Sequence, residues 1–176
     1  MYVANLEKRK NPFLFLRIAD ELNKKLKEKA IFIILGDKRD TEFFSSFLKF
    51  IEKKNYIYYL GFKKDPSDYI YGADLFIATY EKEGFGRTIV ESMLLKTPVL
   101  AYSSGGLKEI IFDRLNGYLF KNKKNINKIS TKAFNILENK KKTKKIVNNA
   151  YQNAVSKYSI LKYKKKLNEF YKSLVN

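Results

Sequence analysis

Residues 74–109 constrain the fold of this chain more than any other stretch, because a glycine-rich turn and a helical pattern lie between two short apolar segments. Residues 74–78 (DLFIA) and 98–102 (PVLAY) have the composition of buried strands. After Arg87 the apolar residues recur at helical spacing, at Ile89, Val90, Met93 and Leu94. We therefore predict a βαβ unit of a parallel sheet. Loops that follow such strands lie where open α/β sheets bind ligands.

The turn of this unit reads Glu83-Gly84-Phe85-Gly86 and indicates an anion site. Glycines let a ligand approach the backbone, and the helix that begins after them offers free N–H groups and the positive end of its dipole. Glu83 and Glu91 flank the helix start with seven residues between them. Carboxylates offer paired acceptors that suit the vicinal hydroxyls of a sugar. The alternative interpretation is a tight turn with two surface glutamates.

A set of ordered motifs resembles the donor-binding half of the group-1 (family four) retaining glycosyltransferases. The motifs are VANLEKRKNP at 3–12, IFIILGD at 31–37, YLGFKKDPSDYIYGADLFIA at 59–78, EGFGRTIVESM, TPVLAYSSGGLKEII and NGYLF. The spacing of Glu83 and Glu91 matches the two glutamates that mark this family. The resemblance implies one half of a GT-B fold, which is an α/β, Rossmann-like, doubly wound parallel sheet, here followed by extra C-terminal helices.

The resemblance also implies a nucleotide diphosphate sugar as the donor substrate, with no separate cofactor. Glu83 would meet hydroxyls of the transferred hexose, and Glu91 would hold those of the ribose. Lys10 and the amides around residues 85–88 would neutralise the leaving diphosphate, so Glu83 and Lys10 are the predicted catalytic residues. The implied donor-binding residues are Arg9, Gly61, Phe62, Lys63, Gly84, Phe85, Gly86, Arg87, Thr88, Glu91, Gly105 and Gly106.

Some positions depart from the family pattern. Asn5 stands where the family usually presents an arginine to the diphosphate, and Arg9 is the candidate to compensate for it. Lys38 replaces the second glycine of a Gly-Asp-Gly turn. For Phe62, packing in the core is an equal alternative to contact with the base. Glu109 is interpreted as structural.

The composition excludes several kinds of chemistry. The 176 residues contain no cysteine and no histidine, which excludes disulfides, thiolate chemistry, a Ser-His triad and the usual zinc sites. With no Asp-x-Asp motif, we predict no divalent metal. No apolar run approaches the 18 residues of a membrane span, and the start lacks the pattern of a signal peptide. The expected location is therefore cytoplasmic.

Charge is distributed unevenly along the chain. Residues 121–176 hold 16 lysines and two glutamates, which is +14 of the total of +18. Such asymmetry can mark an anionic partner, and a peripheral contact with an anionic membrane is one expectation. The other is that lysines only solvate helix faces. We expect no nucleic acid, because no basic and aromatic platform is visible.

The remaining elements follow from local signals. We predict strands at 2–6, 31–35, 56–60 and 117–120, a helical turn at 66–72, and a helix at 12–29 that Asn11 caps. A helix capped by Asp40 or Thr41 should bury a stripe of four residues, namely Phe44, Phe47, Leu48 and Ile51. Three helices should complete the chain, the last capped by Ser159.

We predict a single domain, residues 1–176, without the N-terminal acceptor domain of the family. In the family the last helix crosses onto that missing domain, so three alternatives remain for the apolar side of residues 160–174. The chain is a fragment, a partner chain supplies the other half, or the last helix folds onto its own domain. The predicted function is the donor-binding domain of a hexosyltransferase. It would act on a glycan or polyprenyl-linked acceptor in bacterial cell-surface polysaccharide biosynthesis, such as lipopolysaccharide or capsule. The alternatives are a non-catalytic nucleotide-sugar-binding module or fragment, and a basic adaptor that binds anionic membrane through residues 121–176.

Overall fold

The structure is a computed structural model that describes residues 1–27 and 29–175. Its parallel strands form two ladders, β1-β2-β3 and β4-β5-β6. The strands are β1 (Tyr2–Val3), β2 (Phe32–Leu35), β3 (Ile57–Tyr59), β4 (Phe76–Ala78), β5 (Val99–Tyr102) and β6 (Tyr118–Phe120). The ladders meet where the Ile77 N–H donates to the Met1 carbonyl at 2.9 Å. The strand order is therefore β3-β2-β1-β4-β5-β6.

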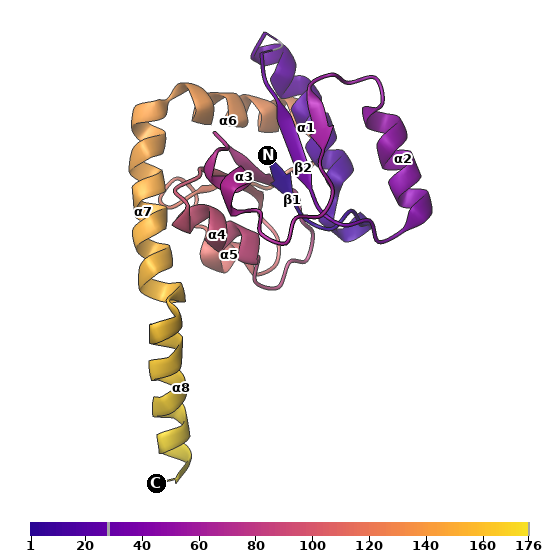
Figure 1. Cartoon of the computed structure of the whole chain (residues 1–176). Helices are drawn as coiled ribbons and strands as arrows, with labels where there is room; N and C mark the ends of the chain where they lie inside the picture. The colour runs from indigo at the N-terminus through magenta and orange to yellow at the C-terminus, as the bar shows by residue number, and fades with distance from the viewer. Residues whose placement is uncertain (28, 176) are drawn as a thin grey trace.

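This order confirms the predicted doubly wound sheet. Parallel crossovers are right-handed, so the helices after β1 and β2 cover one face and those after β4 and β5 cover the other. The order reverses between β1 and β4, and this is the point at which open α/β sheets bind ligands. Figure 1 shows α1 and α2 on one side of the sheet centre, and α4 and α5 on the other.

The helices alternate with the strands up to β6 and then continue alone. A short 3₁₀ turn, η1 (Lys8–Lys10), precedes α1. The alternating helices are α1 (Pro12–Lys25), α2 (Thr41–Ile51), α3 (Ser67–Tyr71), α4 (Arg87–Leu94) and α5 (Leu107–Ile110). The C-terminal helices are α6 (Ile126–Glu138), α7 (Lys140–Tyr158) and α8 (Ile160–Val175). Helix α6 packs against α1 and α7 against α4, so these two helices clamp both halves of the sheet.

Local capping explains several helix starts. The Asn11 side chain accepts from Leu14 N, and Pro12 occupies the first helical position, as predicted. Asp40, rather than Thr41, caps α2 by accepting from Phe43 N at 2.6 Å. Helix α4 begins at Arg87 after Gly86, which has a left-handed backbone with φ of 74°.

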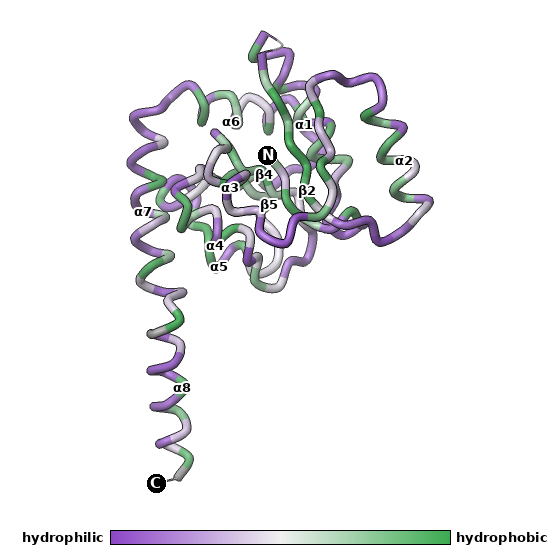
Figure 2. Tube along the Cα trace, in the orientation of Figure 1, coloured by the Kyte–Doolittle hydropathy of each residue, from purple (hydrophilic) through white to green (hydrophobic). Residues whose placement is uncertain are grey.

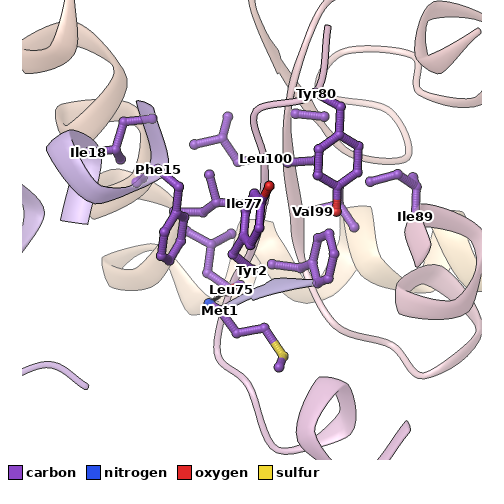
Figure 3. Close-up of a cluster of buried hydrophobic side chains, with 14 of the residues drawn as sticks. Met1, Tyr2, Phe15, Ile18, Leu75, Ile77, Tyr80, Ile89, Val99 and Leu100 are labelled. Atoms are coloured by element: carbon purple, nitrogen blue, oxygen red, sulfur yellow. Dashed lines mark hydrogen bonds between the residues drawn. The ribbon is translucent and has the colours of Figure 1, made fainter. Parts of the chain in front are cut away.

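The core joins the two halves of the sheet. Its buried side chains form one cluster that includes strands of both ladders and the helices around them. Tyr2 of β1 lies against Phe15 of α1, with ring centroids 5.2 Å apart, and edge-on to Tyr80 at 5.8 Å. Figure 3 shows Tyr2 and Tyr80 among aliphatic side chains of α1, β4, α4 and β5. These two buried tyrosines therefore tie the centre of the sheet together.

Helix α1 is shorter than the predicted 12–29. It ends at Lys25, and Lys27 has a left-handed backbone with φ of 53°, which stops helical hydrogen bonding. The Asn23 side chain then accepts from Ala30 N at 3.4 Å and turns the chain toward β2.

The predicted buried stripe of α2 is wrong at Leu48, which is 41% exposed. Strand β3 is the edge of the sheet, so α2 covers it from one side only. The helix instead turns phenylalanines toward Phe13 of α1, with Phe43 and Phe50 at centroid distances of 5.3 and 5.9 Å. Phe47 of the predicted stripe is fully buried.

Helix α8 extends away from the rest of the chain (Figure 1), so of the three alternatives the one in which it folds onto its own domain is wrong. Its apolar residues Ile160, Tyr163, Phe170 and Leu174 are 56 to 65% exposed. Figure 2 shows apolar and polar positions alternating along α8, as in an amphipathic helix. Among the described residues, no helix combines the length and the apolarity that crossing a bilayer requires.

Two glycine turns pack directly on each other and shape the carboxyl edge of the sheet. The Gly106 N–H donates to the Glu83 carbonyl at 2.8 Å. A Cβ added at Gly106 would overlap the Gly84 carbonyl oxygen, and one at Gly105 would overlap that of Glu83. Gly84 itself has open space at the Cβ position. The turn after β5 therefore supports the turn after β4 only because it is made of glycine.

We predict that Gly106→Ala lowers the free energy of unfolding by about 2 kcal/mol or more, because backbone atoms must move to admit the methyl group. Gly84 lies in the other of the two packed turns, and its Cβ position is open. Gly84→Ala should therefore change the free energy of unfolding by less than about 0.5 kcal/mol. Urea unfolding followed by circular dichroism measures both. Equal stability of the two variants would contradict the packing described.

Candidate functional site

A cleft of about 650 Å³ opens at the carboxyl ends of β1 and β4, where the strand order reverses. The loops after β1, β2, β3 and β4 and the first two turns of α4 form its walls. The lining residues are Val3, Ala4, Asn5, Lys10, Leu35, Gly36, Phe62, Lys63, Lys64, Pro66, Tyr80, Glu83, Phe85, Gly86, Arg87, Thr88 and Glu91. Residues from four separate loops thus converge on one site.

The loops after β1 and β4 are fastened side by side. The Thr79 hydroxyl donates to the carbonyls of Lys10 and Asn11 at 3.1 and 2.9 Å. The Glu81 N–H donates to the Arg9 carbonyl at 2.8 Å, and the Asn11 amide donates to the Glu81 carboxylate at 2.9 Å. A hydrogen bond from Lys123, with its charge, holds the pKa of Glu81 below its usual range. The backbone on each side of the cleft floor is therefore fixed.

This fastening brings Lys10 against Glu83. The Lys10 ammonium donates to the Glu83 carboxylate, and the two side chains are only 14 and 15% exposed. The same ammonium lies over the ring of Tyr80, 4.7 Å from its centroid. The two predicted catalytic residues thus meet at the cleft floor, although 73 positions separate them in sequence.

Tyr80 forms the floor beneath Lys10. Its hydroxyl donates to the Val3 carbonyl at the end of β1 and lies 3.4 Å from the Thr88 hydroxyl in α4. Burial, with the nearby charges of Glu83 and Glu91, raises the pKa of Tyr80 far above its usual value. The phenol therefore keeps its proton and serves as a fixed donor that links β1 to β4 and α4.

The start of α4 faces the same cleft. Gly86 precedes the helix with a positive φ, a conformation that a larger residue adopts only with strain. Arg87 and Thr88 are the first helical residues, and the N–H groups of a first turn have no partner within the helix. No acidic side chain lies in the first turn of α4 to compensate for them. The arrangement favours an anion at this point.

Glu91 lies one turn further along α4, half-buried and lining the cleft. Within residues 1–27 and 29–175, no ion pair engages its carboxylate. Its two oxygens are therefore available as acceptors for a ligand, and hydroxyl groups are the donors that suit them. Four cations line the cleft, namely Lys10, Lys63, Lys64 and Arg87, and they outnumber its two carboxylates.

The loop after β3 closes the far end of the cleft. Phe62 is 66% exposed and lines the cleft with Lys63, so the alternative that Phe62 packs in the core is wrong. Gly61 has a φ of 70°, and its carbonyl accepts from Gly36 N at 3.0 Å. Gly61 thus shapes this loop without lining the cleft.

Most predicted site residues gather in the cleft, and five do not line it: Arg9, Gly61, Gly84, Gly105 and Gly106. The Arg9 side chain is 48% exposed and pairs with Glu7 at 2.9 Å, lying 3.7 Å from Glu83. Gly105 and Gly106 instead lie beneath residues 83 and 84 and support them. The ligand-binding roles of these five residues stay predictions.

Several lining residues lay outside the prediction, chiefly Tyr80 and Lys64. Tyr80 lies two residues after the end of β4 and is buried in the core, and the sequence offered no sign of its contact with Lys10. Lys64 follows Lys63 directly, and the pair of lysines was the available signal. The absence of a metal also stays a prediction, although no group of three metal-binding side chains occurs among the described residues.

Comparison with known proteins places this chain in a family. The family described as "Glycosyl transferases group 1" matches residues 1–153. The chain is 31% identical over 115 residues to a poly(ribitol-phosphate) alpha-N-acetylglucosaminyltransferase of Staphylococcus aureus (strain COL). That match covers 63% of this chain and 23% of the relative. The chain spans 23 to 36% of the length of the curated relatives that it matches.

Solved structures agree with the fold. Anabaena Alr3699/HepE in complex with UDP superposes with a TM-score of 0.86 at 24% identity, over 98% of this chain and 48% of that one. The C-terminal domain of the group 1 family protein LpcC from Francisella tularensis superposes with a TM-score of 0.78 at 26% identity, over 90% and 85% of the two chains. The resemblance seen in the sequence is thereby confirmed. This chain belongs to the group-1 glycosyltransferases, and it has the fold of the C-terminal, donor-binding half of a GT-B enzyme.

Proposed function

We propose that this chain binds a nucleotide diphosphate sugar and serves as the donor half of a retaining hexosyltransferase. The observation that carries the proposal is the meeting of Lys10, Glu83, the α4 N-terminus and Glu91 in one cleft at the strand-order reversal. Each group suits one part of such a donor. A nucleotide diphosphate sugar carries two phosphates between two polyhydroxy rings, and the cleft offers both cations for the phosphates and carboxylates for the hydroxyls.

In this proposal Glu91 accepts from the ribose hydroxyls and Glu83 from hydroxyls of the hexose. Lys10 and the amides at residues 85–88 hold the diphosphate and stabilise the negative charge that grows as it leaves. The loop at residues 61–63 meets the base. Transfer retains the anomeric configuration, and the leaving phosphate takes the proton of the acceptor hydroxyl. No protein nucleophile is invoked.

Relatives support the donor class. The Anabaena protein has been solved with UDP, with UDP and glucose, and with UDP-glucose. The names of two curated relatives, from Staphylococcus aureus and Campylobacter jejuni, describe the transfer of N-acetylated amino sugars. We extend to this chain only the class, which is a hexose carried on a nucleotide diphosphate.

We propose that the acceptor is a glycan or a polyprenyl-linked sugar of a cell-surface polysaccharide, used on the cytoplasmic side of the membrane. The acceptor site then lies in a further domain or chain, because the described cleft accounts for the donor alone. A non-catalytic nucleotide-sugar-binding module is the alternative that keeps the same cleft. It predicts that donor binding occurs but that no acceptor domain restores transfer.

One observation favours a second candidate function, a contact with anionic membrane. Helix α8 presents exposed apolar side chains, including Tyr163 and Phe170, on a helix that also carries five lysines and one glutamate. Interfacial helices combine these features. This contact is compatible with the donor site and would hold the chain near a lipid-linked acceptor.

The donor site is tested by calorimetric titration of the purified chain with UDP, GDP and ADP. One of the three should bind saturably. Glu91→Ala should weaken that binding more than tenfold, because the ribose hydroxyls lose their paired acceptor. Glu109→Ala is the matched control, since Glu109 is an exposed glutamate outside the cleft. Equal affinities of Glu91→Ala and the parent chain would remove Glu91 from the ribose role, and no binding of any nucleotide would reject the donor site.

Lys10→Ala should weaken binding of the same diphosphate about tenfold or more, a loss typical of a charge-assisted contact. The loss combines the missing cation with the freed negative charge of Glu83. Lys8→Ala is the control, because Lys8 lies in the same 3₁₀ turn but is exposed outside the cleft. A change of less than twofold in Lys10→Ala would show that the ammonium does not meet the phosphates.

Binding should not depend on a divalent metal. The Kd measured in EDTA and the Kd measured in magnesium chloride should agree within about twofold, since Lys10 and the helix amides supply the positive charge. A loss of binding in EDTA that magnesium restores would contradict this assignment.

A further inference from the structure

Arg39 lies in the loop between β2 and α2, and its side chain is held on Asn5. With the Asn5 amide oxygen facing the guanidinium, Arg39 Nε and Nη2 each donate to that oxygen at 3.1 Å. The opposite orientation would place N–H groups against N–H groups, so this is the orientation that satisfies both side chains. The Arg39 guanidinium is therefore fixed one hydrogen bond away from a residue that lines the cleft.

The backbone around this contact is also fixed. The Leu6 N–H donates to the Asp37 carbonyl at 2.8 Å, and Leu6 and Lys38 form a parallel bridge. The loop after β2 thus runs beside the loop after β1. The placement of Arg39 beside Asn5 consequently rests on the sheet and not on the side chains alone.

The Arg39 guanidinium is held by a neutral amide rather than by a carboxylate. Within residues 1–27 and 29–175, no carboxylate lies within ion-pairing distance of its guanidinium. A guanidinium has five N–H donors, of which Asn5 uses two. The remaining three keep the planar fork that matches a phosphate, and they keep its full charge.

Arg9, the residue predicted to compensate for the asparagine at position 5, is placed differently. It pairs with Glu7 and approaches Glu83, so two carboxylates already share its charge. Neither arginine lines the cleft, but Arg39 is hydrogen-bonded to Asn5, which does. Of these two arginines beside the cleft, Arg39 is thus the one that makes no ion pair within the described residues, while Arg87 lines the cleft itself at the start of α4.

We propose that Arg39 is a further donor-binding residue, whose guanidinium, anchored on Asn5, binds the diphosphate of the nucleotide sugar. This inference rests on the proposed function of the cleft. It adds Arg39 after β2 to the positive groups that the cleft already offers to the phosphates, which include Lys10 after β1 and the N-terminus of α4 with Arg87. Asn5 acts as a positioning residue, which sets the orientation of the guanidinium.

The test compares ligands that differ only in phosphate. UDP, GDP and ADP are titrated first into the parent chain, and the nucleotide that binds is then compared with its own nucleoside at constant ionic strength. Arg39→Ala should weaken the diphosphate about tenfold and leave the nucleoside within twofold. Lys38→Ala is the matched control, because Lys38 is the preceding exposed lysine of the same loop and carries the same charge. It should change neither affinity by more than twofold.

A double-mutant cycle tests the anchoring. Asn5→Ala should weaken diphosphate binding in the parent chain but have little further effect in the Arg39→Ala background, because the two side chains act as one unit. Arg39→Lys keeps the charge but loses the planar fork of N–H donors. It should therefore bind the diphosphate more tightly than Arg39→Ala but more weakly than the parent chain.

Three outcomes would overturn the inference: unchanged diphosphate affinity in Arg39→Ala, equal losses for the diphosphate and the nucleoside, or equal losses in Arg39→Ala and Lys38→Ala. Each would be seen while the parent chain still binds its nucleotide. Failure of the parent chain to bind any nucleotide is a different result, which rejects the donor site itself. Arg39 is exposed, so its substitution leaves the core intact, and circular dichroism checks this.

Discussion

The hydrogen bonds that fasten the loop after β1 to the loop after β4 are the constraint on which the cleft depends. Thr79 and Glu81 on one side hold the backbone of residues 9–11 on the other. Tyr80 adds a bond from its buried phenol to the Val3 carbonyl. Since β1 and β4 flank the reversal of strand order, these bonds also join the two halves of the sheet. Lys10 and Glu83 meet because the loops that carry them have no freedom to separate.

The second constraint is the close contact of the two glycine turns. Residues 105 and 106 approach the backbone of residues 83 and 84 so closely that side chains are excluded. Glu83 is thereby supported from below by a rigid turn, while Lys10 holds its carboxylate at the floor of the cleft. Rigid backbone of this kind provides fixed dipoles and charges, which stabilise a developing anion without reorganising. The cleft is in this sense built by elements that bear no reactive group themselves.

The sequence predicted the features that depend on local chemistry. The βαβ unit followed from helical spacing at Ile89, Val90 and Met93, and the α1 start followed from Asn11 and Pro12. The family motifs then ordered the loops, and the cleft contains Lys10, Glu83 and Glu91 as the resemblance implied. The local patterns need only residues that are close in sequence, and the family motifs indicate the fold of the whole domain.

What the sequence did not predict depends on contacts between distant residues. The exposure of Leu48 follows from the edge position of β3, which no helical pattern reveals. Tyr80 has the hydropathy of a core residue, and its second role beneath Lys10 comes from a contact across 70 positions. Asn5 signalled a missing arginine, yet the neighbouring Arg9 pairs with acids while Arg39, 34 positions away, reaches Asn5. Charge alone cannot say which cation is free.

A crystal structure of this chain with the nucleotide diphosphate that binds it tests the proposed donor site most directly. We expect the ribose to lie at Glu91 and the phosphates to lie between Lys10 and the first turn of α4. A nucleotide bound elsewhere on the chain, or one whose phosphates point away from Lys10 and α4 into solvent, would contradict it.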